Sequence, residues 1–141
     1  MKHNLVISLI LLLAVLISCT KEETKELNFC QKLSQCNEAS IELEDSTTKD
    51  IYLLSVLGVR KNSCSISLSI QEAHTEQLKP LEKSSAVCTQ EWNNKFEKIA
   101  SFDASTCKKY VDNILVNLIN DVANKNSNTC SGELKERLLA K

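Results

Sequence analysis

The fold depends on one stretch, residues 51–70, which reads IYLLSVLGVRKNSCSISLSI. Its first seven residues are apolar except for Ser55, so they suit a buried helix that begins after Thr48 or Asp50. Residues 63–70 instead alternate strictly between serine and a less polar residue, which is typical of a half-buried strand. With Arg-Lys-Asn at residues 60–62 as a turn, the two runs form a β-hairpin in this second interpretation.

We favour the helical interpretation, because the rest of the chain offers few other strands that could complete a sheet. Ile66, Ile70, Ala73 and Gln77 also fit one face of a helix. Glycine occurs twice and proline once in 141 residues, whereas hairpin-rich folds need residues that accept unusual backbone angles. The sequence therefore predicts a mainly α fold, a small helical bundle stapled by disulfides. The alternative is an α+β fold with a hairpin at about 51–70.

Four further helices are predicted where apolar residues recur every three or four positions. They cover about 104–125, 85–100, 25–38 and 133–140. The first has a broad apolar stripe, and Asp103 is placed to cap its N-terminus. Ser84 or Ser85 is the expected cap of the helix over 85–100, and Ser131 is the expected cap of the last helix.

The beginning of the chain indicates export. Residues 5–17 are apolar except for Ser8, and Lys2 supplies a positive charge ahead of them. As a helix this run is roughly 20 Å long at ~1.5 Å per residue, too short for the ~30 Å hydrocarbon core of a bilayer. It has the length of the apolar region of a signal peptide, which we assign to residues 1–18.

The apolar run ends in Leu16-Ile17-Ser18-Cys19, which resembles the lipobox of bacterial lipoproteins, the mark of a type II signal peptide. The resemblance covers residues 1–19 and implies cleavage before Cys19 and attachment there of acyl chains such as palmitate. Two or three acyl chains hold a protein on a membrane without a spanning helix. Residues 19–26 are then the lipidated cysteine and a polar tether. Thr20, which is not the Asp that retains lipoproteins in the inner membrane, favours the outer membrane.

Residues 27–141 are expected to form a single domain. Removal of the signal leaves 141 − 18 = 123 residues, enough for a modest hydrophobic core. The signal contains one Lys and no acid, so the formal charge of the remainder is 16 − 18 = −2. Neither this charge nor any cluster of like charges suggests that the protein binds nucleic acid.

An even number of cysteines after Cys19 predicts three disulfides in an exported chain. These cysteines are Cys30, Cys36, Cys64, Cys88, Cys107 and Cys130. They lack the close spacing of a metal site, so no metal is expected. If 85–100 and 104–125 are antiparallel neighbouring helices, Cys88 lies beside Cys130, and this is the preferred pair. Cys107 is then expected to form a disulfide with Cys30, Cys36 or Cys64. Because Cys30 and Cys36 lie on one helix, they are expected to bond to different partners.

No set of nucleophile, base and orienting acid stands out in the sequence, so no catalytic residue is assigned. His74 is the one histidine after the signal, and its polar neighbours indicate a solvated side chain. Five acids fit better as helix-surface or capping charges, namely Glu91, Glu97, Asp103, Asp112 and Asp121. Four aromatic side chains could line a ligand groove, but their helical spacing favours a packed core: Trp92, Phe96, Phe102 and Tyr110.

These features predict a membrane-anchored lipoprotein of the bacterial cell envelope, not an enzyme and without a cofactor, whose domain is a binding module for an unknown protein partner. The alternative is a small envelope enzyme, or an inhibitor of one, that acts through surface carboxylates. A third, less favoured reading is a carrier of a small ligand. Exposed apolar residues gathered on one face would favour the binding module. Two carboxylates of raised pKa in a cleft would favour the enzyme. A sizeable apolar cavity would favour the carrier.

Overall fold

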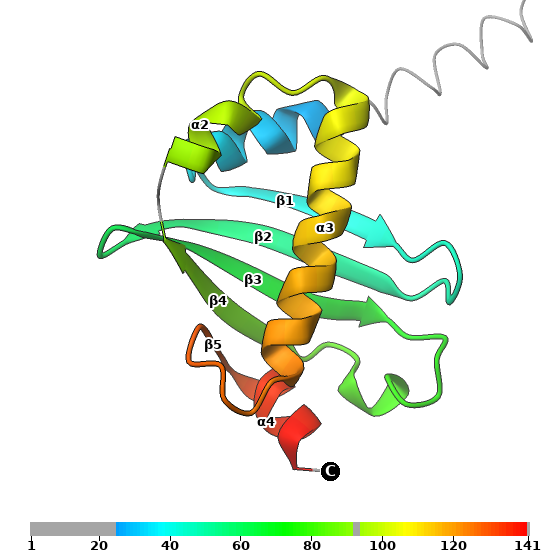
Figure 1. Ribbon diagram of the computed structural model, residues 1–141. Coiled ribbons are helices and arrows are strands. Elements are labelled where there is room, and N and C mark those ends of the chain that lie inside the picture. The colour runs from blue at the N-terminus through cyan, green and yellow to red at the C-terminus, as the bar shows by residue number, and fades with distance from the viewer. Residues whose placement is uncertain (1–24, 92–93, 141) are drawn as a thin grey trace, which may run out of the picture.

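A five-stranded antiparallel sheet, in the order β1-β2-β3-β4-β5, forms the centre of the fold, and helices pack against one of its faces (Figure 1). The structure is a computed structural model that describes residues 25–91 and 94–140. Its elements, in chain order, are a helix over residues 25–34, β1 (Ala39–Glu44), β2 (Ile51–Arg60), β3 (Ser63–Glu72), the 3₁₀ helix η1 (Lys79–Leu81), β4 (Ser85–Glu91), α2 (Asn94–Ile99), α3 (Ala104–Ala123), β5 (Cys130–Ser131) and α4 (Glu133–Leu139). The fold is α+β, so the predicted mainly α-helical bundle is wrong.

Residues 51–70 form the hairpin of β2 and β3, not a helix. The strands are joined by the two residues Lys61 and Asn62, whose φ angles of 48° and 64° are those of a type I′ turn. Such a turn matches the twist of the two strands, and asparagine tolerates its positive φ without glycine. The scarcity of glycine therefore did not argue against a hairpin at this place.

Three strands that the sequence analysis missed complete the sheet, namely β1, β4 and the short β5, which pairs with β4. In β1, Ile41 and Leu43 are buried, while the residues between and beside them are exposed, which is the two-residue period of a strand. In β4, Ala86 and Cys88 are buried with the same period, and β4 pairs with β3. The predicted helix over 85–100 is therefore wrong: its first part is a strand, and only α2 is helical.

The long helix α3 covers one face of the sheet, which it crosses in Figure 1. Its buried residues are Cys107, Val111, Ile114, Leu115, Leu118 and Val122. The predicted cap is confirmed, because the backbone N–H of Thr106 donates to Oδ1 of Asp103 at 2.7 Å. On the opposite face the strands carry mostly exposed or half-buried side chains.

The other two predicted caps are wrong. Ser84 is buried and its hydroxyl donates to the carbonyl of Leu81, while Ser85 lies in β4. The N-cap of α4 is Gly132, not Ser131. Gly132 has φ of 122°, and a Cβ added to it would lie 2.9 Å from the carbonyl oxygen of Ser85, so this close approach requires glycine.

Three disulfides are present, as predicted: Cys30–Cys107, Cys36–Cys64 and Cys88–Cys130. The preferred pair of Cys88 and Cys130 is formed, but the argument that led to it was wrong. The two cysteines face each other on the neighbouring strands β4 and β5, not at the ends of two helices. The helix over 25–34 ends earlier than the expected residue 38, and Cys36 lies in the turn after it, with φ of 49°.

Candidate functional site

The residues that the sequence analysis considered for catalysis do not form a site. His74 is exposed, as expected, and its Nε2 lies 3.5 Å from Oε1 of Glu72. Asp103, Asp112 and Asp121 are each nine residues apart, so about 13 Å of helix axis separates each from the next. The α3 acid Asp112 is exposed and lies 3.6 Å from Nζ of Lys108.

The remaining two acids, Glu91 and Glu97, lie in different elements, at the end of β4 and within α2. Glu91 is thus on a strand and not on the expected helix. Cys19, the signal (1–18) and Trp92 lie outside the described residues. Within the described part of the chain, no group of three or more His, Cys, Asp or Glu side chains is placed to hold a metal ion.

The described aromatic side chains belong to the core. Phe96 is buried, and Phe102 and Tyr110 pack against the core with their ring centroids 5.4 Å apart in an edge-to-face arrangement. Burial raises the pKa of the Tyr110 hydroxyl. A separate apolar hollow beneath α3 and α4 has a volume of about 130 Å³, below the 300 Å³ or more of ordinary ligand sites. A carrier function therefore gains no support from it.

Asp50 is the one acid among the described residues that is buried, with 1 % of its surface exposed. Its Oδ1 accepts the backbone N–H groups of His74 at 2.6 Å and Thr75 at 2.9 Å, and its Oδ2 accepts the Thr75 hydroxyl at 2.6 Å. Burial by itself raises the pKa of Asp50, but hydrogen bonds from Thr48, Thr75 and His74 outweigh it and hold the pKa far below its usual range. A general acid needs a raised pKa, so Asp50 suits the role of an anchor for the loop after β3.

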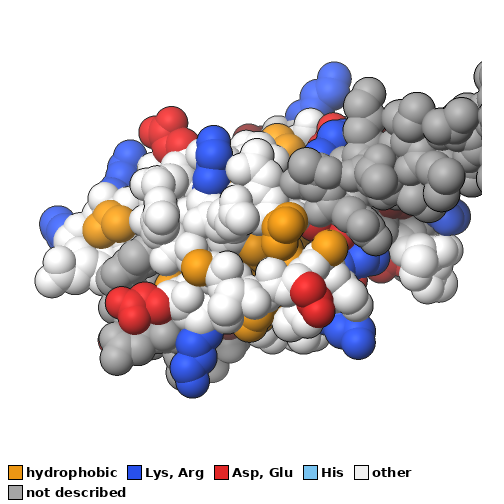
Figure 2. Space-filling model, turned by 90° about the horizontal axis from the view of Figure 1, so that it is seen from above, with side chains coloured by type: hydrophobic (Ala, Val, Ile, Leu, Met, Phe, Trp, Pro, Cys, Tyr) orange, Lys and Arg blue, Asp and Glu red, His pale blue; other side chains and the backbone are white. Residues whose placement is uncertain are grey.

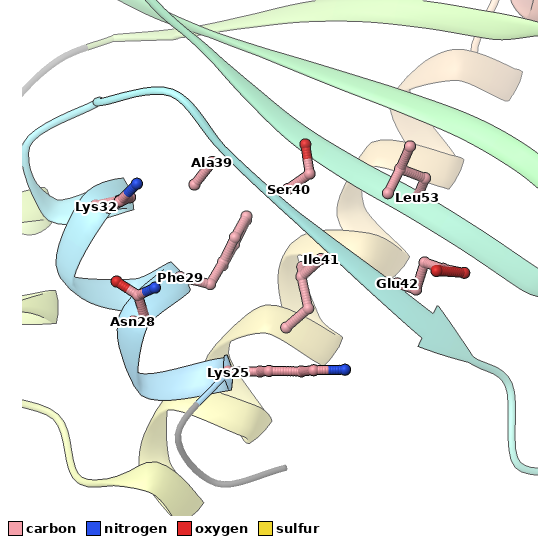
Figure 3. A pocket seen from close by; sticks show the side chains of 9 residues that line it. All are labelled: Lys25, Asn28, Phe29, Lys32, Ala39, Ser40, Ile41, Glu42 and Leu53. Atoms are coloured by element: carbon pink, nitrogen blue, oxygen red, sulfur yellow. The ribbon is translucent and has the colours of Figure 1, made fainter. Parts of the chain in front are cut away.

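A groove runs between the helix over 25–34 and β1, with a volume of about 430 Å³ (Figure 3). Its lining residues are Lys25, Asn28, Phe29, Lys32, Ala39, Ser40, Ile41, Glu42 and Leu53. Four of these are consecutive residues of β1, and successive side chains of a strand point to opposite faces. A groove that contacts all four therefore lies along the edge of the strand. In Figure 3, Phe29 and Ile41 project into the space between helix and strand.

The backbone of β1 offers free hydrogen-bonding groups to this groove. The N–H of Asp45 donates to the carbonyl of Asp50 at 2.9 Å, which identifies this pair as hydrogen-bonded. Because hydrogen-bonded and non-hydrogen-bonded pairs alternate in an antiparallel ladder, Ser40, Glu42 and Glu44 form the non-hydrogen-bonded pairs with β2. Their N–H and C=O groups consequently point outward, away from β2. The 2.9 Å contact between Oγ of Ser40 and Oγ of Ser55 agrees with this, because side chains are closest in such pairs.

The two walls of the groove carry opposite charges. Lys25, Asn28 and Lys32 are exposed and follow each other at three- and four-residue steps, so they share one face of the helix. On the strand side Glu42 is exposed, and no described residue makes an ion pair with it. Glu44 is also exposed, and it pairs with Nζ of Lys49 at 2.9 Å.

Two disulfides hold the helical wall of the groove in place. Cys30 ties the helix to α3 through Cys107, and Cys36 ties the turn after the helix to β3 through Cys64. Phe29, Cys30 and Leu33 of this helix are buried. The wall is thus fixed by covalent bonds at two points and by apolar packing between them.

Exposed apolar side chains do not form a large patch on the described surface. The large exposed ones are Leu57 and Val59 near the β2–β3 turn and Val116 on α3. Figure 2 looks down on the end of the molecule where the helix over 25–34 lies, and the apolar areas there are small and lie among charges of both signs. The described residues thus do not form the apolar face that would favour the binding module, and the groove along β1 is the better candidate.

The sequence contains one signal for this site. Ala39-Ser40-Ile41-Glu42-Leu43-Glu44 alternates between apolar and polar residues, which predicts a strand with one polar face. Nothing in the sequence shows that this strand lies at the edge of the sheet or beside the helix, since both depend on the tertiary fold.

No helix among the described residues has the length and apolar character needed to cross a membrane. No family model, no curated protein and no solved structure matches the chain.

Proposed function

We propose that this protein is a lipid-anchored component of the bacterial cell envelope whose domain binds an extended segment of a partner protein as an additional strand along β1. The observation that carries the proposal is the open edge of β1, which lies along the groove. Strand addition gains affinity from main-chain hydrogen bonds, and pockets for alternate side chains give specificity. The outward backbone groups of Ser40, Glu42 and Glu44 and the groove beside them supply these two elements.

An open strand edge normally invites unwanted pairing, and proteins protect such edges with charges, bulges or covering elements. The edge of β1 carries exposed carboxylates but lies beside a pre-formed groove of about 430 Å³. The helical wall of the groove is rigid because two disulfides hold it. A rigid groove lowers the entropy that a partner loses on binding, since only the partner has to be ordered. These features support a binding function rather than a catalytic one.

Photocrosslinking in the native envelope tests the proposal. We expect a photoreactive amino acid in place of Glu42 to capture a partner protein, because the side chain at this position flanks the added strand. The matched control replaces Val116, which is 55 % exposed on α3 and does not line the groove. Mapping the crosslinked peptide should identify one continuous segment of the partner. Equal capture from both positions, or crosslinks to many unrelated segments, would remove the support for a strand-binding edge.

A further inference from the structure

The charges on the two sides of β1 restrict which strand can bind there. A strand added antiparallel to β1 forms hydrogen-bonded pairs with Ser40, Glu42 and Glu44, because their backbone groups point outward. The side chains of these pairs lie on the face of the sheet away from α3, beside the exposed carboxylates. The residues between them point to the other face, toward the helix over 25–34.

The charges thus differ on the two sides of the added strand, although Glu44 on the open face is already paired with Lys49. On the open face, Glu42 has no ion pair among the described residues, and a basic side chain directly opposite it forms a favourable cross-strand pair. On the helical side, Lys25 and Lys32 flank the groove, and Phe29 and Ile41 give its floor an apolar part. Acidic and apolar side chains suit that side.

A second copy of this chain does not fit the edge. An antiparallel pairing of β1 with its copy that is centred on Glu42 places the two Glu42 side chains opposite each other. A pairing centred on Leu43 places Glu42 opposite Glu44, and one centred on Ile41 places Glu42 opposite Ser40 and brings Glu38, just before β1, opposite Glu44. Like charges directly opposite each other destabilise a pair of strands. The same carboxylates that repel a copy attract a basic strand.

We infer, on the basis of the proposed function, that the partner segment carries Lys or Arg at alternate positions, where these side chains face Glu42 and Glu44. The residues between them are acidic or apolar and face Lys25 and Lys32. The occupant is therefore a peptide segment of alternating charge, bound in an extended conformation.

Fluorescence anisotropy with the full chain in mild detergent tests the inference. The probe is a labelled nonapeptide with lysine at every second position and valine or glutamate between. The second peptide has the charges reversed, with glutamate at every second position and valine or lysine between. We expect the first peptide to bind the unaltered protein and Glu42→Lys to weaken it by roughly tenfold, since an attractive pair becomes a repulsive one. The reversed peptide should bind Glu42→Lys better than it binds the unaltered protein.

Glu91→Lys is the matched control, because it makes the same charge change at an exposed residue on β4, three strands from β1. It should leave both affinities unchanged. A further pair of probes separates the inference from the proposed function. Methyl groups on the lysine backbone nitrogens of the first peptide should abolish binding, because these nitrogens face β1. Methyl groups on the intervening nitrogens, which face away, should not.

The outcomes are distinct. Equal binding of both peptides that is still lost on methylation of the β1-facing nitrogens would leave strand addition standing and overturn the charge pattern. Failure of every peptide to bind, or equal binding of the two methylated forms, would overturn strand addition itself. A doubled molar mass of the full chain in light scattering that is abolished by Pro in place of Glu42 would show that a second copy occupies the edge, which would also overturn the inference.

Discussion

At the scale of single residues, Asp50 ties the loop after β3 to the start of β2. Its carboxylate accepts three hydrogen bonds from His74 and Thr75 and is shielded from water. Because these bonds favour the charged form, the pKa of Asp50 is lowered in the folded state. A lowered folded-state pKa adds stability above the unfolded pKa of about 3.9, and this stability is lost as the pH falls below that value.

We therefore expect Asp50→Asn to lower the free energy of unfolding at pH 7 by on the order of 2 kcal/mol, the usual scale for a hydrogen bond to a charged group. The difference between variant and unaltered protein should shrink as the pH falls from 5 toward 2. Urea denaturation followed by circular dichroism at several pH values measures it. Asp112→Asn, at an exposed position on α3, serves as the control and should change little. A constant difference at all pH values would contradict the role of the Asp50 charge.

At the scale of elements, the disulfides connect different parts of the fold. Cys30–Cys107 spans 77 residues and holds the helical wall of the groove, whereas Cys88–Cys130 spans 42 residues and joins β4 to β5. In the chain-entropy model these loops contribute about 4.5 and about 4 kcal/mol, so their loss should cost similar stability. Only the first should affect the groove.

We expect the double variant Cys30→Ala/Cys107→Ala to lose most of its affinity for the alternating lysine peptide, because the helix beside β1 is no longer tied to α3. The variant Cys88→Ala/Cys130→Ala is the matched control, with a similar loss of stability but unchanged affinity. Anisotropy titrations at a temperature where both variants remain folded make the comparison. Equal losses of affinity would mean that the disulfides act on global stability alone.

At the scale of the whole molecule, the predicted lipid anchor sets where the groove stands. Lys25 lines the groove and is six residues after Cys19, so at an extended length of about 3.5 Å per residue Lys25 is at most about 20 Å from the predicted lipidation site. The groove would then face partners at the membrane surface, not partners deep in the surrounding compartment.

We expect Cys19→Ala to abolish the incorporation of radiolabelled palmitate and to leave an uncleaved precursor, because the thiol that carries the diacylglycerol is lost. Cys130→Ala removes a cysteine of the domain and should keep the label, which makes it the control. Gel electrophoresis with autoradiography measures both. Labelled palmitate in the Cys19→Ala protein would contradict the assignment of the lipobox.

The sequence by itself determined the local features that depend on short spacing. The three disulfides follow from an even cysteine count, and the cap at Asp103 and the helix after it follow from local hydrogen bonding and a broad apolar stripe. The strict alternation of residues 63–70 also indicated a strand correctly, because the two-residue period of a strand is a local property.

The fold class was decided only by the tertiary structure. An apolar run such as residues 51–57 is compatible with a buried helix or a buried strand, and the choice depends on whether distant segments pair with it. Here β1 and β3 flank it, and β4 continues the sheet, so backbone pairing over long sequence distances outweighs the helical spacing of single segments. The groove has the same origin, since the edge of β1 and the helix beside it meet only after the sheet has formed and the disulfides have closed.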